Sequence, residues 1–317
     1  MSDIDLNRVK HYLMSLQDTL CERVSQLNNG LPFQTDEWQN HSGGGGRTRV
    51  VDDLDEDRAL TSGHNIIEKG GVNFSHVYGD SLPAAASAKR PEIAGKPFQA
   101  MGVSSVIHPT NPFAPTAHMN VRFFVADYDS SNPVWWFGGG YDLTPYYPVD
   151  ADILHWHKTA KAACDQFDSE YYAKYKAWCD EYFYLKHRKE TRGVGGLFFD
   201  DFTEGGFEQA FGFMQNVGNS FGDAYLPIVE RNKDRAFTDE QKAFQSYRRG
   251  RYVEFNLIYD RGTIFGLQAG GRIESILMSL PANVSWKYAW QATPGTAEKQ
   301  LTDYYLKPQD WLGLLAK

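Results

Sequence analysis

Residues 104–147 form the stretch that says most about the fold: SSVIHPTNPFAPTAHMNVRFF (104–124), a polar turn, then WWFGGGYDLTPYY (135–147). Both segments read as strands, and DYDSSNP between them is typical of a hairpin connection. The two segments place histidines, an arginine, an aspartate and a glycine run within apolar sequence. Polar groups embedded in apolar strands are typical of an enclosed small-molecule site.

Side chains alternate between the two faces of the strand expected at 118–127. His118, Asn120 and Arg122 share one face, and the apolar residues between them take the other. The apolar face predicts a core. The row of hydrogen-bonding groups on the other face predicts a ligand-binding surface.

The hairpin register decides what Arg122 and Asp142 meet. A simple register places Arg122 opposite Gly140, and Asp142 opposite Asn120 on the same polar face. The glycine would then leave room for a ligand beside Arg122. The structural alternative is an Asp–Arg pair that ties the hairpin together, with glycines easing a bend.

The remaining segments predict a single α+β domain over residues 1–317, built on a large, mostly antiparallel sheet. Helical spacing of apolar residues predicts a helix over 4–28, and a Thr238–Gln241 capping box predicts the start of another. Further helices are expected at 150–187, 207–221 and 270–280. Further strands are expected at 98–108, 134–141, 193–202 and 252–262, and flexible loops near 39–62 and 80–97.

Composition excludes several classes of protein. The net charge of −8 argues against nucleic acid as the main partner, because phosphate binding needs a positive field. No signal peptide, transit peptide or membrane-spanning stretch is recognisable. The three cysteines lack metal or disulfide spacing, which is typical of a reducing cytoplasm.

The nine histidines raise the question of a metal site. His155 and His157 stand two apart on an expected helix, so they point in different directions. There is no H-E-x-x-H pattern and no cysteine pair. A site assembled across the fold stays open, although the spacing does not favour one.

Arginines from distant parts of the chain suit an anionic ligand. Arg188 and Arg192 lie four apart, and Arg272 follows a double glycine before a helix, where it can grip a carboxylate. Together with Arg122 they would supply three or four cations. The alternative for each is a solvated surface arginine.

Taken together, these motifs resemble the oxygen-dependent coproporphyrinogen III oxidase family. The resemblance runs from the opening helix to PQDWL (308–312). Its strongest motifs are GGVNFSHVYG (70–79), HPTNPFAPTAHMNVRFF (108–124), WWFGGGYDLTPYY (135–147), HWHKTAKAACDQF (155–167), HRKETRGVGGLFFDDF (187–202) and YVEFNLIYDRGTIFGLQAGGRIESILMSLP (252–281).

The resemblance implies a broad sheet with helices on both faces, and a cytoplasmic homodimer. It implies the oxidative decarboxylation of two propionates of coproporphyrinogen III to vinyls, giving protoporphyrinogen IX in heme biosynthesis. Molecular oxygen would be the co-substrate, without an organic cofactor. A divalent metal has been attributed to some members, at positions that correspond to His108, His118, His157 and His187, but their spacing carries no metal signature.

The resemblance also implies residue roles. Ser104 corresponds to a substrate contact, His118 to a proton donor, and Arg122 with Asp142 to a catalytic pair. Residues 252–287 correspond to a dimer-forming region. Two substrate-binding segments are implied, Asn120-Val121-Arg122 and Gly270-Gly271-Arg272, and we expect Arg192 to add a further substrate-binding cation.

Two other functions compete with this one. The first is a metal-dependent oxygenase that uses a histidine cluster. The second is a non-enzymatic tetrapyrrole carrier with the same binding face.

Overall fold

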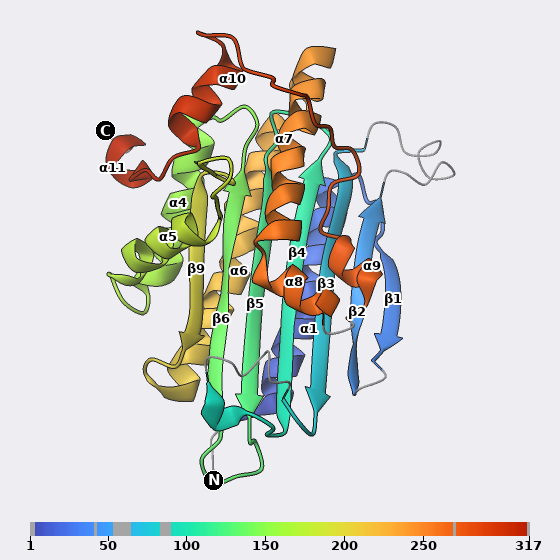
Figure 1. Cartoon of the computed structure of the whole chain (residues 1–317), viewed down its shortest axis with the longest axis vertical. Helices are drawn as coiled ribbons and strands as arrows, with labels where there is room; N and C mark the ends of the chain where they lie inside the picture. The colour runs from blue at the N-terminus through green and yellow to red at the C-terminus, as the bar shows by residue number, and fades with distance from the viewer. Residues whose placement is uncertain (1–3, 41–42, 53–64, 83–89, 269–270, 316–317) are drawn as a thin grey trace.

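One seven-stranded sheet organises the chain, as Figure 1 shows. The computed structural model describes residues 4–40, 43–52, 65–82, 90–268 and 271–315. The strands follow the order β1-β2-β3-β4-β5-β6-β9, and every neighbouring pair is antiparallel. Their bounds are β1 Gln34–Gln39, β2 Gly44–Asp52, β3 Ile67–Gly79, β4 Phe98–Pro109, β5 Thr116–Ala126, β6 Val134–Thr144 and β9 Gly195–Phe202.

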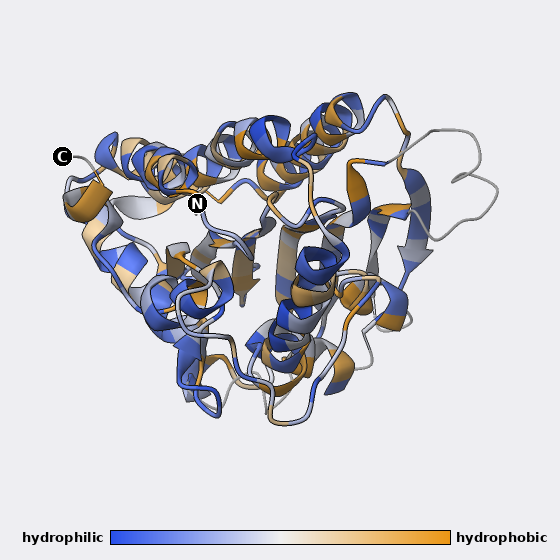
Figure 2. Ribbon diagram, turned by 90° about the horizontal axis from the view of Figure 1, so that it is seen from above, coloured by the Kyte–Doolittle hydropathy of each residue, from blue (hydrophilic) through white to orange (hydrophobic). Residues whose placement is uncertain are grey.

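Helices lie on both sides of this sheet (Figures 1 and 2). Behind it in Figure 1 run α1 (Leu6–Leu27) and α6 (Gly206–Asn232), and in front of it lie α7 (Asp239–Ile258), α8 (Arg261–Gln268) and α9 (Ile273–Leu277). The expected α+β class with two helical layers is therefore confirmed. The remaining elements are η1 Pro91–Ile93, α4 Asp150–Asp165, α5 Tyr171–Tyr182, β7 Tyr184–Leu185, β8 Glu190–Thr191, α10 Ala297–Gln300, η2 Leu301–Tyr305 and α11 Trp311–Leu315.

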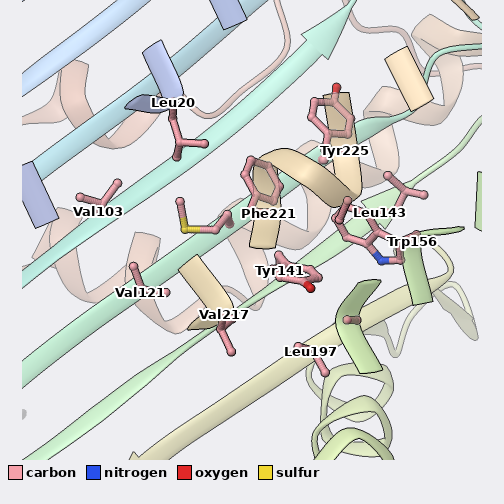
Figure 3. Packing of buried hydrophobic residues seen from close by; sticks show 14 of the residues in the cluster. Leu20, Val103, Val121, Tyr141, Leu143, Trp156, Leu197, Val217, Phe221 and Tyr225 are labelled. Atoms are coloured by element: carbon pink, nitrogen blue, oxygen red, sulfur yellow. The ribbon is translucent and has the colours of Figure 1, made fainter. Parts of the chain in front are cut away.

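The main core fills the space between the sheet and α1, α4 and α6 (Figure 3). The expected apolar face of β5 belongs to it, since Met119, Val121 and Phe123 are at most 1% exposed. Because side chains alternate along a strand, the other face of β5 points toward the layer of α7 and α8. Figure 3 labels the residues Leu20, Val103, Val121, Tyr141, Leu143, Trp156, Leu197, Val217, Phe221 and Tyr225.

Several predicted elements are confirmed with their terminal signals. The helix expected over 4–28 is α1, and the Asp5 side chain accepts a bond from the backbone N–H of Arg8 at 2.9 Å. The capping box of Thr238 and Gln241 opens α7 as expected. The strands expected at 98–108, 118–127, 134–141 and 193–202, and the helices expected from 207 and within 270–280, also form.

Two predicted elements are wrong. The helix expected over 150–187 is broken after Asp165, where the Asp168 side chain accepts a bond from the backbone N–H of Glu170 and the chain turns into α5. The strand expected at 252–262 is instead the end of α7. Tyr252 and Phe255 are buried at helical spacing there, and the alternation of apolar and polar residues was misleading.

The loop expected near 39–62 is also wrong over residues 44–52, which form β2 between β1 and β3. Glycine at 46 lets the backbone approach Trp38 closely, because a Cβ there would lie 2.4 Å from the indole. Residues 41–42, 53–64 and 83–89 of the expected loops lie outside the described residues. Among the helices that are described, none is long and apolar enough to cross a membrane.

Candidate active site

The β5–β6 hairpin places His118 opposite Asp142, Asn120 opposite Gly140, and Arg122 opposite Gly138. This register differs by two residues from the expected one, because β5 ends at Ala126, before a residue in the left-handed region. A shift of two keeps every side chain on its own face. Asp142 therefore lies on the polar face as predicted, but beside His118.

Asp142 is the centre of a buried hydrogen-bond network. His118 Nδ1 lies 3.0 Å from Oδ1 of Asp142, and Arg192 donates to both carboxylate oxygens, at 2.6 and 3.0 Å. Arg192 also donates to Oδ1 of Asn256 at 2.8 Å. The side chains of Asp142 and Arg192 are each 2% exposed. Both oxygens of Asp142 are therefore engaged by protein.

Electrostatics keep Asp142 ionised. Burial would raise the pKa of its carboxyl, but the charge of Arg192 and the bonds from His118 and Arg192 outweigh burial, so the pKa lies below its ordinary value. The guanidinium of Arg192 lies 4.1 Å from the ring centre of Phe183 and 4.5 Å from that of Tyr252. Enclosed in this way, Arg192 balances Asp142 and is not a free cation for substrate.

His118 is the exposed member of this network. Its side chain is 22% exposed, and its Nδ1 faces the ionised Asp142. A carboxylate accepts only, so we assign the proton to Nδ1. Within the described residues no partner is bonded to Nε2, so this nitrogen is open to a ligand. Asp142 thus fixes the orientation and tautomer of the ring.

Arg122 belongs to a second cluster on the same face. It donates to Oδ1 of Asn120 at 3.0 Å and pairs with Asp200 at 2.8 Å. Asp200 also meets Arg261 at 3.5 Å. The side chain of Arg122 is 35% exposed, so this cation remains accessible. Sequence reasoning missed Asp200 and Arg261, although Asp200 stands in the quoted motif at 187–202.

The glycine opposite Arg122 was expected to leave room for a ligand. In the structure this glycine is Gly138, and it makes room for the ion pair of Arg122 and Asp200. A Cβ at 138 would lie 2.8 Å from Oδ1 of Asp200 and 2.9 Å from Nη2 of Arg122. Gly140 has a different role, because its φ is +142° and a Cβ there would lie 1.9 Å from the Leu197 carbonyl oxygen. The glycine run therefore serves both the ion pair and the close approach of β6 to β9.

Arg272 anchors a third cluster, at the N-terminus of α9. It forms an ion pair with Asp36 of β1 and donates to the Ser275 hydroxyl at 3.2 Å. Ser275 bonds the Thr48 hydroxyl at 2.7 Å, and Thr48 bonds Asn73 at 2.7 Å. The cluster ties α9 to the sheet.

A row of four polar residues, one on each of the strands β2 to β5, connects this cluster with Arg122. Three strand spacings separate its ends, which is roughly 14 Å. The predicted site residues Ser104, Asn120, Arg122 and Arg272 thus lie on one side of the sheet. The row consists of Thr48, Asn73, Ser104 and Asn120, opposite one another on β2 to β5.

Three predicted residues do not present a side chain to this face. Val121 is fully buried on the opposite face of β5, in the main core. Gly271 uses its backbone N–H to bond the Gly266 carbonyl at 2.8 Å. Gly270 lies outside the described residues.

The four histidines considered for a metal do not come together. His108 and His157 are fully buried, and both nitrogens of each ring bond a protein hydroxyl or carbonyl within 3.1 Å. Burial and neighbouring positive charges lower the pKa of both rings to about 3. His187 pairs with Glu254 instead. Among the residues the structure describes, no three His, Cys, Asp or Glu side chains could hold a metal ion, so these histidines do not fit a metal site.

An ionised carboxylate that orients a histidine, on the same face as partly exposed arginines, is an arrangement that suits acid–base chemistry on an anionic substrate. The family model for coproporphyrinogen III oxidase matches residues 8–311 of the 317. The chain therefore belongs to the coproporphyrinogen III oxidase family, and its activity is the oxidative decarboxylation of coproporphyrinogen III in heme biosynthesis. The match gives no support to a histidine-cluster oxygenase or to a non-enzymatic carrier.

Proposed function

We propose that this oxidative decarboxylation takes place on the sheet face that carries His118, Asn120 and Arg122, and that it yields protoporphyrinogen IX. The observation that carries the proposal is the pairing of a partly exposed His118 with a buried, ionised Asp142, on the same strand face as the accessible Arg122, which lies four residues along β5 from His118. A proton-transfer group and a carboxylate-binding group thus share one surface.

Arg122 is the proposed partner of the reacting propionate. Its guanidinium is partly exposed and is already oriented by Asn120 and Asp200. A charge-assisted hydrogen bond to a carboxylate contributes about 1.5–3 kcal/mol. Arg272 would bind a second propionate at the far end of the polar row, with Ser104 and Asn120 between the two as neutral hydrogen-bonding groups.

The chemistry balances with oxygen as the oxidant. Each propionate loses CO₂ and two electrons to become a vinyl group, and O₂ takes up the two electrons with two protons to leave as hydrogen peroxide. One of those protons comes from the carbon beside the ring and the other from the enzyme or solvent. His118 is the proposed proton-transfer group, and Asp142 is the residue that positions it.

We further propose that neither an organic cofactor nor a divalent metal takes part, and that oxygen is the only co-substrate. The engagement of His108 and His157 by protein groups supports the metal part of this proposal. The test compares turnover of exhaustively chelated protein with that of untreated protein. Equal rates agree with the proposal, and a loss that is restored by adding one metal would contradict it.

The proposed assembly is a cytoplasmic homodimer that joins through the described part of residues 252–287, the region that the resemblance implies. Several large apolar side chains are exposed in this region and directly after it, as is usual where a chain meets a partner. They are Leu257, Ile258, Leu267, Ile273, Trp286 and Tyr288. Sedimentation of the wild type and of an Ile258→Asp, Ile273→Asp variant tests the dimer: the variant should be monomeric, and a monomeric wild type would overturn it.

The assay that tests the function uses purified protein with coproporphyrinogen III, in air and under strict anaerobiosis. Protoporphyrinogen IX should form only in air, together with CO₂ and hydrogen peroxide. Product formation without oxygen, or none with it, would contradict the proposed reaction.

A further inference from the structure

A polar pocket lies away from the proposed substrate face, between α7, the residues around β8 and the segment 290–302. Its volume is about 330 Å³. None of its described lining residues belongs to the seven-stranded sheet. We propose that this pocket binds a small organic oxyanion, a phosphate or carboxylate attached to a single flat ring.

Buried cations give the pocket its charge. The side chains of Arg248 and Arg251 are 5% and 7% exposed. Arg248 pairs with Glu190 at 2.8 Å, and Arg251 pairs with Glu254 at 3.0 Å. Glu254 also accepts two bonds from Arg188, at 2.7 and 2.8 Å. Among the described residues these three arginines therefore share two carboxylates, so the cluster of five side chains carries a net positive charge.

Guanidinium donors remain for an incoming anion. Among the described residues, Nη1 of Arg188 and both Nε and Nη1 of Arg248 have no hydrogen-bond partner. A guanidinium binds carboxylate or phosphate oxygens through parallel N–H bonds. Lys299 also lines the pocket, with Nζ 2.7 Å from Asp303 and 40% of its side chain exposed. The donor set thus suits an oxyanion.

The surroundings of Arg251 also favour the binding of an anion. Burial lowers the pKa of Arg251, the hydroxyl of Tyr247 and the carboxylate of Glu254 oppose this effect, and the charges of Arg248 and Arg188 add to it. An anion placed between these arginines would reduce their mutual repulsion.

An aromatic wall defines the rest of the ligand. The rings of Tyr247 and Trp290 line the pocket, with centroids 4.7 Å apart and planes inclined at 55°. A flat ring would pack against Trp290 while its oxyanion reaches the arginines. Small-molecule pockets span roughly 300–1,000 Å³, so this one lies at the small end and suits a one-ring ligand rather than a tetrapyrrole.

Calorimetric titration at low ionic strength tests the site, with phenyl phosphate and inorganic phosphate as probes. Both should bind, and phenyl phosphate should bind more tightly. Arg248→Gln should weaken the binding of phenyl phosphate by about tenfold or more, as expected for the loss of one charge-assisted hydrogen bond. Trp290→Ala should abolish the preference for phenyl phosphate and keep phosphate binding. Arg8→Gln is the matched control, because Arg8 pairs with Glu208 on the exposed surface.

Lys299→Gln keeps the test decisive if Arg248→Gln does not fold, because Lys299 is partly exposed. This substitution should weaken the binding of phenyl phosphate by about threefold. No heat with either probe, or equal affinity in wild type and all pocket variants, would overturn the proposal. It would also fall if the binding were lost in Arg122→Gln, since the anion would then occupy the sheet face. These outcomes do not depend on turnover.

Discussion

His118 and Asp142 share one hydrogen bond but differ in exposure, 22% against 2%. Exposure separates the group that can meet a substrate from the group that holds it in place. Arg122 and Arg192 differ in the same way, at 35% and 2%. This difference supports the proposed roles, in which His118 transfers protons and Arg122 binds a carboxylate, while Asp142 and Arg192 are positioning residues.

Substitution of the two members of this pair should have different consequences. His118→Gln should lower turnover by about 10²–10⁴-fold, because it removes a general acid or base. Its free energy of unfolding should stay near the wild-type value. Asp142→Ala should lower turnover and also the free energy of unfolding by about 3–5 kcal/mol, because Arg192 is left buried without a counter-charge.

Steady-state product formation and urea unfolding of both variants provide the measurements. Near-normal turnover of His118→Gln would exclude the proposed role. Wild-type stability of Asp142→Ala would show that Arg192 finds another partner.

Gly138 and Gly140 offer a second contrast, because both are glycines of one strand. At Gly138 an added Cβ meets only the ends of the Asp200 and Arg122 side chains, which can move. Gly138→Ala should therefore raise KM by displacing Arg122, with little change in stability. Gly140→Ala should destabilise the fold by several kcal/mol, on the order of the strain of a forced backbone contact. Kinetics and thermal unfolding check the pair, and equal losses of stability would contradict it.

Sequence reasoning found the residues of the polar face but not their partners. Alternation along β5 is a local property, so His118, Asn120 and Arg122 could be placed together. The partners of Arg122 and Asp142 come from β9 and from the turn after β8, tens of residues away. Which distant side chain fills the space is decided by tertiary packing, and no local pattern contains it.

At the scale of elements, a local sequence signal predicted the structure correctly where all residues of the signal were present. The capping box at Thr238 predicted the start of α7. The alternating pattern of residues 252–258 predicted a strand, although α7 continues to Ile258. The strands β1 and β2 have no strong strand propensity, and the glycines of β2 suggested a loop. β2 forms because β3 offers it a pairing edge, and β1 then pairs with β2.

The cap of α7 gives a prediction at this scale. Thr238 accepts a bond from the backbone N–H of Gln241, and the Gln241 side chain accepts one from the backbone N–H of Thr238. Thr238→Ala should lower the free energy of unfolding by about 1 kcal/mol, and Thr238→Ser should restore most of it. Turnover should not change, because the cap lies far along α7 from Asn256. Denaturant midpoints that do not separate the two variants would contradict this role.

At the scale of the whole molecule, one carboxylate holds α7 against the sheet. Glu68 of β3 lies 2.6 Å from Arg249 and 3.1 Å from Lys242, both on α7. It also accepts a bond from Asn283 at 2.6 Å. The side chain of Arg249 is fully buried. This contact fixes the helix that carries Tyr252 and Asn256 over the polar face.

Glu68→Gln should therefore destabilise the protein by about 3–5 kcal/mol at neutral pH, because Arg249 loses its buried counter-charge. The effect should depend on pH. Burial raises the pKa of Glu68, but Arg249, Lys242 and Asn283 lower it more, so it falls from 4.5 to about 2. A carboxyl with a depressed pKa in the folded state stabilises the fold above its unfolded pKa and loses this contribution as the pH falls.

The stability difference between wild type and Glu68→Gln should accordingly be full above pH 4.5 and shrink as the pH approaches 2. Urea unfolding at a series of pH values measures it. Glu208→Gln is the control, because its pair with Arg8 is exposed on both sides and should contribute little at any pH. A difference that stays constant down to pH 2 would mean that Glu68 acts through packing, and that its charge does not hold α7 in place.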